Sequence, residues 1–172
     1  WKIPTTDHES QLETDQYDTS DAIYTIAEDA KGNILGCSRL IPTIKPYLLA
    51  EKFSFLCSET LPSTCFTWEI SRFAGESYES NDLPIEIFKR SLRYAWDNGA
   101  KSVVAVTTVE MERYFKWKEV PTRRMGIPVC KNRINLIALE FPNQNNNNVS
   151  VVVRGGLHVG SPGGERVKLN AG

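Results

Sequence analysis

Hydrophobic and polar residues alternate along the first part of the chain in the pattern typical of β-strands. Residues 23–27 and 34–40 carry this alternation, and the Gly-containing turn at 31–33 lies between them. We therefore expect an antiparallel hairpin. Comparable apolar or alternating runs predict further strands, at 65–73, 102–106, 133–141 and, as an edge strand, 149–153.

Apolar residues recur at helical spacing between Pro84 and Asp97, which predicts the longest helix. Asp82 can cap its start, and Asn98-Gly99 can close it. A short helix is expected within 47–56. Thr107-Thr108-Val109-Glu110 predicts a capping box that opens another helix, through about Phe115.

This order of elements favours an α/β fold with a mixed, mostly antiparallel central sheet flanked by helices. We expect one domain over residues 1–154, because 172 residues suit a single core. Residues 155–172 are Gly-rich, so we expect a flexible tail.

Composition narrows the classes of partner. The chain has 20 basic and 21 acidic residues, so a nucleic-acid partner is not expected. No apolar run approaches the roughly 20 residues of a membrane helix, and the N-terminus lacks the apolar core of a signal peptide. We therefore expect a cytoplasmic protein without a membrane partner.

Metal and disulfide chemistry are not expected either. The four cysteines form no CxxC pair, and their spacings suit neither a zinc site nor a disulfide framework, so we expect reduced thiols. His8 and His158 both lie in polar segments, and no HExxH, Walker A or GxGxxG motif occurs. No metal site is predicted.

Charged residues occupy unusual positions near the predicted strands: Asp15, Asp18, Arg39, Glu69 and Arg72. One interpretation is a structural ion-pair network. The other is a polar cleft in which a carboxylate acts as base and arginines bind an anion or a polar cofactor. Glu69 and Arg72 are three apart, so they lie on opposite faces of the strand unless it is bulged.

At these residues the sequence resembles the acyl-homoserine lactone synthases, over roughly residues 1–141. The resemblance is carried by Trp1, the E-x-D-x-Y-D pattern at 13–18, the R-L-x-P-T pattern at 39–43, and W-E-x-S-R-F at 68–73. That family has about thirty residues before the position of Trp1, so we expect this chain to lack an N-terminal segment.

The resemblance implies a fold similar to the GNAT acyltransferases and a role in quorum sensing. It implies two substrates, S-adenosylmethionine and an acyl group on acyl carrier protein, and no cofactor. The amine of S-adenosylmethionine attacks the thioester, and the product closes to a lactone with release of methylthioadenosine.

The resemblance also implies residue roles. Glu69 and Arg72 are the expected catalytic residues. Glu69 is the candidate base, and backbone N–H groups of a bulged strand near Arg72 and Phe73 would bind the oxyanion. Arg72 would also join Asp15, Asp18 and Arg39 in the charged cluster that shapes the S-adenosylmethionine pocket. Other expected positions fall into two groups, an S-adenosylmethionine pocket with Trp1, Asp15, Asp18, Arg39, Phe53 and Phe73, and an acyl-chain pocket with Trp68, Ala105, Thr107 and Met111.

Two further expectations concern the acyl donor. The 3-oxo-selective members of the family tend to carry a Thr where this chain has Ala105, so an unsubstituted acyl chain is expected. Acidic carrier protein would need a local basic surface. Its candidate residues are Lys89, Arg90, Arg93, Lys116, Lys118, Arg123, Arg124, Lys131 and Arg133.

Two alternatives remain at this point. A GNAT-type N-acetyltransferase using acetyl-CoA would need a pyrophosphate loop, and the segment Arg72 to Ser77 matches that loop only in half. A non-catalytic binding module could retain the fold, since fold alone does not fix function. The presence of both Glu69 and Arg72 argues against that second alternative.

Overall fold

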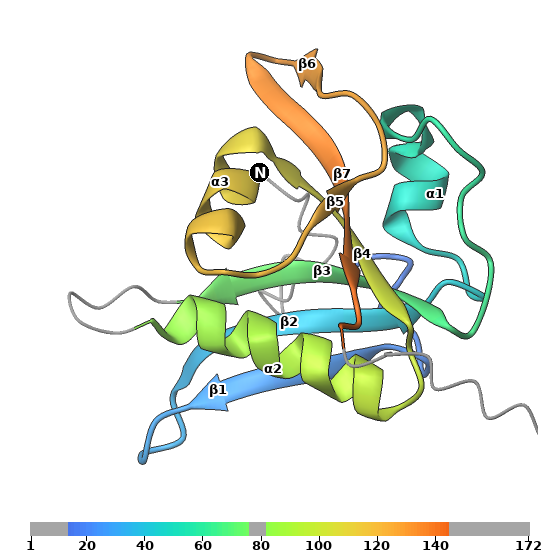
Figure 1. The fold of residues 1–172 in the computed structure, drawn as a ribbon. Coiled ribbons are helices and arrows are strands. Elements are labelled where there is room, and N and C mark those ends of the chain that lie inside the picture. The colour runs from blue at the N-terminus through green and yellow to red at the C-terminus, as the bar shows by residue number, and fades with distance from the viewer. Residues whose placement is uncertain (1–13, 76–81, 145–172) are drawn as a thin grey trace, which may run out of the picture.

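The computed structural model describes residues 14–75 and 82–144 (Figure 1). These residues form a seven-stranded sheet in the order β1-β2-β3-β4-β7-β5, with β6 paired to β7. Only β3 and β4 run parallel, so the expected mixed, mostly antiparallel sheet is confirmed. The strands are β1 Ile23–Glu28, β2 Ile34–Pro42, β3 Thr67–Gly75, β4 Ser102–Thr108, β5 Arg123–Arg124, β6 Val129–Lys131 and β7 Ile134–Pro142.

Helices cover both faces of the sheet. The helices α2 (Leu83–Asp97) and α3 (Val109–Trp117) pack on one face (Figure 1). Phe88 stacks there on Phe115, with ring centroids 4.4 Å apart. The short helix α1 (Leu48–Lys52) and the 3-10 turn η1 (Ser54–Leu56) pack on the other. Two apolar cores therefore flank the central strands, one under α2 and α3 and one under α1.

The expected hairpin and the expected long helix are both present. β1 and β2 pair as predicted. α2 ends at Asp97, and Asn98 is its C-cap before Gly99, whose φ of +91° suits glycine. The predicted role of Asp82 is wrong in part, because it stands at the N-cap but makes no capping hydrogen bond. Its carboxylate pairs instead with Lys118, at 2.5 Å.

The predicted capping box begins one residue too early. β4 continues through Thr108, which pairs with Leu136 of β7, so Thr107 is still a strand residue. The Thr108 hydroxyl then accepts a hydrogen bond from Met111 N at 3.3 Å and caps α3. Thr107 therefore keeps its place on the same face of β4 as Ala105.

Two short strands were not predicted. β5 and β6 both pair with β7, and each has only two or three residues, too few for a periodic pattern. The expected edge strand at 149–153 and the tail at 155–172 lie outside the described residues. Among the residues that are described, no helix is long and apolar enough to cross a membrane.

Candidate active site

A bulge in β3 shapes the centre of the sheet. β2 and β3 pair at Arg39↔Ser71 and again at Cys37↔Ala74, so β3 contains one more residue than β2 between these two pairs. Arg72 sits in the bulge with a φ of +49°. In a regular strand Arg72 would face away from Glu69; the bulge turns it to the same side.

Four charged side chains meet beside this bulge. Arg39 Nη1 lies 2.6 Å from Asp15 Oδ1 and also contacts Asp18. Arg72 Nη2 lies 3.1 Å from a carboxylate oxygen of Asp15 and 3.1 Å from one of Asp18. The structure therefore brings together the four charged residues that the sequence analysis assigned to the S-adenosylmethionine pocket.

Burial makes this cluster electrostatically strong. The Arg39 side chain is 1% exposed, and a buried guanidinium needs paired carboxylates. Burial alone would lower the pKa of Arg39, but hydrogen bonds from the guanidinium to Asp15 and Asp18 raise it. Burial likewise opposes ionisation of Asp18, yet hydrogen bonds from Tyr24, from the Asp15 N–H and from Arg39 leave its pKa lowered. Arg39 and Asp18 therefore stay charged near neutral pH.

Glu69 lies on the same face, 1% exposed, at the start of α1. Its Oε2 accepts a hydrogen bond from Leu48 N at 2.9 Å, and its Oε1 accepts one from Leu49 N at 2.7 Å. Burial raises the pKa of Glu69 to about 7, although these two hydrogen bonds oppose the rise. A carboxyl with this pKa can exchange a proton near neutral pH.

Glu69 also has a structural role at the start of α1. Tyr47, at the N-cap of α1, makes no side-chain capping bond. The Glu69 carboxylate instead accepts hydrogen bonds from the first N–H groups of the helix. Each carboxylate oxygen keeps a second lone pair for a substrate proton or a water. Anchoring α1 and accepting a proton are therefore compatible tasks.

One polar atom at the bulge has no partner. Arg72 Nε is buried and, among the described residues, makes no hydrogen bond. A buried donor left unpaired costs about 1–3 kcal/mol. A ligand with an acceptor at this point would remove that cost.

The aromatic residues expected in the same pocket separate. Phe53 is buried in the core under α1, on the face of Glu69. Phe73 faces the other way, with its ring 5.4 Å from that of Phe88 under α2, because the bulge at Arg72 reverses the alternation. The structure thus does not bring Phe73 to the charged cluster. Trp1 lies outside the described residues.

The residues expected around the acyl chain gather on the α2 and α3 face. Trp68 and Ala105 are buried in the core there, and Met111 packs against it. Thr107 shares this face of β4 by alternation and is half-buried. The charged cluster and this apolar group thus lie on opposite faces of the sheet.

The two faces meet where β3 and β4 part. Their pairing covers only Thr67↔Ser102, Trp68↔Val103 and Glu69↔Val104. Beyond this point β3 pairs only with β2, and β4 only with β7. Glu69 therefore stands at the last paired position, next to an unpaired edge of the bulged strand.

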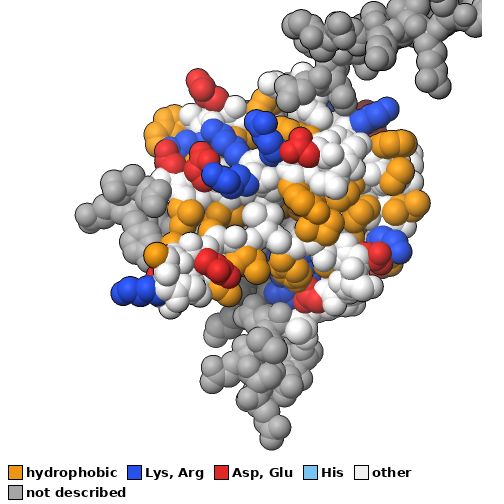
Figure 2. All heavy atoms as spheres, turned by 90° about the horizontal axis from the view of Figure 1, so that it is seen from below, with side chains coloured by type: hydrophobic (Ala, Val, Ile, Leu, Met, Phe, Trp, Pro, Cys, Tyr) orange, Lys and Arg blue, Asp and Glu red, His pale blue; other side chains and the backbone are white. Residues whose placement is uncertain are grey.

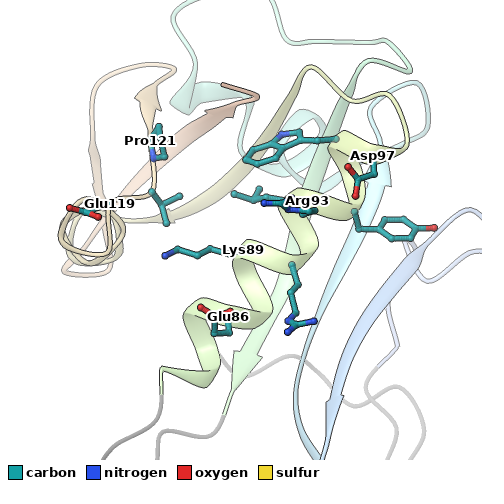
Figure 3. A pocket seen from close by; sticks show the side chains of 11 residues that line it. Glu86, Lys89, Arg93, Asp97, Glu119 and Pro121 are labelled. Atoms are coloured by element: carbon teal, nitrogen blue, oxygen red, sulfur yellow. The ribbon is translucent and has the colours of Figure 1, made fainter. Parts of the chain in front are cut away.

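A hollow on the surface lies away from the charged cluster. It measures about 660 Å³ and is lined by exposed positions of α2, among them Lys89 and Arg93, and by the segment from Glu119 to Pro121 (Figure 3). None of the residues of the charged cluster lines it. We therefore treat it as a surface feature separate from the reacting centre.

Sequence reasoning missed three residues of the site. Ser71 Oγ accepts a hydrogen bond from Arg39 Nε at 3.1 Å, and alternation from Glu69 could have indicated it. Tyr17 is 3% exposed and donates its hydroxyl proton to Glu51 Oε2 at 2.8 Å. No local pattern links these two residues, since they are 34 positions apart.

The fold is similar to that of N-acetyltransferases. The crystal structure of an N-acetyltransferase-like protein from Lactobacillus plantarum aligns with a TM-score of 0.54 at 12% identity, covering 78% of this chain and 81% of that one. That likeness concerns the fold alone, which is GNAT-like. Residues 1–151 match the autoinducer synthase family, and the chain belongs to that family. It is therefore an acyltransferase of the acyl-homoserine-lactone synthase type.

Individual relatives agree with this membership. The acyl-homoserine-lactone synthase of Pseudomonas aeruginosa is 40% identical over 154 residues, which cover 90% of this chain and 76% of that protein. That of Pseudomonas fluorescens is 34% identical, with 82% and 70% covered. The crystal structure of TofI with an inhibitor and MTA aligns with a TM-score of 0.71 at 34% identity, covering 83% and 74%.

Proposed function

We propose that this protein transfers an acyl group from acylated acyl carrier protein to the amine of S-adenosylmethionine, after which the product closes to an acyl-homoserine lactone. The observation that carries the proposal is Glu69, a buried carboxyl with a pKa of about 7 beside a dense charged cluster. The TofI structure, which contains MTA, supports a methylthioadenosine-bearing substrate in the family.

The first step is proton removal from the amine. The ammonium group of S-adenosylmethionine cannot attack a thioester until it loses a proton, and Glu69 accepts that proton directly or through a water. Asp15, Asp18, Arg39 and Arg72 bind the charged amino-acid end of the substrate. Phe53 contributes to the wall of this pocket.

The second step is acyl transfer at the opening between β3 and β4. The amine nitrogen forms a bond to the thioester carbon, the carbon–sulfur bond breaks, and the thiol leaves with a proton. Backbone N–H groups at the bulge, near Arg72 and Phe73, stabilise the oxyanion. Arg72 Nε, which is buried without a partner in the described part of the chain, is a further available donor.

The third step closes the lactone. The carboxylate oxygen of the acylated product attacks its own γ-carbon, the bond from that carbon to the sulfonium breaks, and methylthioadenosine leaves. Atoms and charges balance over the two substrates, so the proposal requires no cofactor. The acyl chain lies meanwhile on the α2 and α3 face, against Trp68, Ala105, Thr107 and Met111.

The acyl donor could be acyl carrier protein or coenzyme A, because the relative MesI, which is 26% identical, is a CoA-dependent acyl-homoserine lactone synthase. Exposed basic residues favour acyl carrier protein as the donor. Lys89, Arg90 and Arg93 are exposed on α2, and within residues 14–75 and 82–144 none has an ion-pair partner. In the view from below, blue Lys and Arg side chains form a group with red Asp and Glu side chains beside it (Figure 2).

Several of the other basic residues expected to dock carrier protein are already engaged. Arg123 pairs with Glu140 at 2.6 Å, and Arg124 pairs with the buried Glu112 at 2.6 Å. Lys116 also pairs with Glu112, and Lys118 pairs with Asp82. The proposed docking surface is therefore centred on Lys89, Arg90 and Arg93, beside the hollow shown in Figure 3.

Product analysis from a heterologous bacterial host tests the proposal. Cells that express the full-length protein should release an acyl-homoserine lactone identifiable by mass spectrometry, and cells that express Glu69→Gln should release far less. Acetylated amines instead of a lactone would favour the acetyl-CoA alternative.

A further inference from the structure

The acidic pair of the charged cluster is held within a closed turn around Tyr17. Asp18 N donates to the Asp15 carbonyl oxygen at 3.1 Å, and Asp15 N donates to Asp18 Oδ2 at 2.8 Å. Tyr17 N donates to Asp15 Oδ1 at 2.9 Å. The orientation of the two carboxylates is therefore linked to that of Tyr17.

Tyr17 is itself fixed from two sides. Its ring lies under the Arg39 guanidinium, whose Cζ is 5.5 Å from the ring centroid. Its hydroxyl donates to Glu51 Oε2 at 2.8 Å, and Gln16 Nε2 donates to the same oxygen at 3.1 Å. Burial, and after it the hydrogen bond to Glu51, raises the pKa of Tyr17, so this hydroxyl remains a donor across the physiological pH range.

Glu51 belongs to α1, and the other end of that helix is bound by Glu69. The N–H groups of Leu48 and Leu49 donate to the Glu69 carboxylate, at 2.9 and 2.7 Å. One turn of helix thus connects the candidate base to the turn that carries Asp15 and Asp18. The connection runs through Glu51 Oε2, which accepts hydrogen bonds from the side chains of Tyr17 and Gln16.

We infer that Tyr17 and Glu51 are positioning residues for S-adenosylmethionine. Through α1 they hold the acidic turn and Glu69 in one frame, so that the charged end of the substrate and its reacting amine are placed together. This inference rests on the proposed function. Neither residue touches the reacting atoms; both act through Asp15, Asp18 and Arg39.

An exposed carboxylate in a surface helix is ordinarily replaceable, which makes the expected effect of Glu51 distinctive. Without the Tyr17 contact, the acidic turn is held mainly by its ion pairs to Arg39 and Arg72. Those pairs must rearrange when a charged substrate enters the cluster. A tether that does not depend on them preserves the turn during binding.

The test compares Tyr17→Phe, Glu51→Ala and Glu51→Gln in the full-length protein, with Lys52→Ala as an exposed control in the same helix. We expect Tyr17→Phe and Glu51→Ala each to raise the KM for S-adenosylmethionine about tenfold, which corresponds to about 1.4 kcal/mol. The KM for the acyl donor should stay unchanged. Glu51→Gln keeps an acceptor oxygen and should stay within about threefold of wild type.

The double variant Tyr17→Phe/Glu51→Ala should be no worse than Glu51→Ala alone, because Glu51→Ala already removes the contact with Tyr17 along with the one with Gln16. Equal changes in both KM values, a fall in melting temperature without a KM change, or multiplied effects in the double variant would overturn the inference. If wild-type protein itself does not use S-adenosylmethionine, the proposed function has failed as well, and the wild-type reaction separates these two cases.

Discussion

At the scale of single residues, burial sets the basicity of Glu69, and the contacts that hold its carboxylate oppose the effect of burial. Hydrogen bonds from Leu48 N and Leu49 N favour the ionised form, while burial disfavours it and raises its pKa to about 7. Arg72, three residues later, offers a buried donor without a partner in the described part of the chain. The bulge places a proton acceptor and a free donor on one short stretch of β3.

The first prediction concerns the base. We expect Glu69→Gln to lower kcat by roughly 100- to 10,000-fold, the usual cost of removing a general base. Gln retains one acceptor for the N–H groups of α1, so circular dichroism should show a folded protein with a lower melting temperature. Glu59→Gln, at an exposed carboxylate, should behave like wild type. Turnover of Glu69→Gln near the wild-type value would refute the assignment.

The second prediction concerns pH. Burial raises the pKa of Glu69 from 4.5 to about 7, so kcat/KM should rise with pH and level off above about 7. The folded chain binds this proton more tightly than the unfolded chain. The resulting stabilisation is complete below pH 4.5 and is lost as the pH rises through about 7.

The matched measurement is the melting temperature against pH in wild type and Glu69→Gln. The difference between the two curves should change between pH 4.5 and 7 and be flat outside this window. Parallel curves, or a rate profile with no inflection near 7, would contradict the account of Glu69.

At the scale of elements, the longer strands and the long helix could be predicted from the sequence, whereas the short strands β5 and β6 and the details that build the site could not. Alternation places Glu69 and Ser71 on one face, but it puts Arg72 on the other. Only the pairing with β2 reveals the extra residue. Positive φ at an arginine has no sequence signal of the kind that glycine or asparagine provides.

A similar limit explains the shift at the start of α3. Thr107 and Thr108 are both suitable capping residues by type, so local sequence alone cannot choose between them. Pairing of β4 with β7 extends the strand to Thr108 and decides the register. Sheet pairing, a non-local interaction, thus sets which hydroxyl faces the acyl-chain side.

The third prediction concerns β4 and the acyl chain. Ala105 is buried on the expected acyl face and offers no hydrogen-bond donor, and an unpaired 3-oxo group there would cost roughly 1–3 kcal/mol. With alkyl and 3-oxo acyl carrier substrates in competition, wild type should prefer the alkyl chain. Ala105→Thr should shift the preference toward the 3-oxo chain, and Thr107→Ala should leave it unchanged. A tenfold wild-type preference for the 3-oxo substrate would sink the idea.

At the scale of the whole molecule, the sheet separates a charged face from an apolar face and joins them where β3 and β4 part. The basic surface of α2 lies on the apolar side, where the acyl chain is expected (Figure 1). Charge along the sequence could not distinguish free from paired basic residues. Arg124 and Glu112, for example, are twelve residues apart yet in bidentate contact.

The fourth prediction concerns docking. Lys89→Glu/Arg93→Glu should raise the KM for acylated carrier protein about tenfold or more and leave the KM for S-adenosylmethionine unchanged, because the acidic carrier loses a complementary surface. A small pantetheine thioester serves as the control donor and should react equally well with the wild-type enzyme and with the double variant. Arg124→Glu is unsuitable as a docking probe, since it would set a second carboxylate against the buried Glu112. Equal effects on both donors would exclude this surface.

The central claim is that the amine of S-adenosylmethionine is acylated by a carrier-bound thioester at Glu69. Its most direct test incubates the purified full-length protein with S-adenosylmethionine carrying ¹⁵N in its α-amino group and with acylated carrier protein, and follows the products by mass spectrometry. The account predicts a ¹⁵N-labelled acyl-homoserine lactone and methylthioadenosine in equal amounts, both nearly abolished by Glu69→Gln. Product without the label, or labelled product formed equally well by Glu69→Gln, would contradict it.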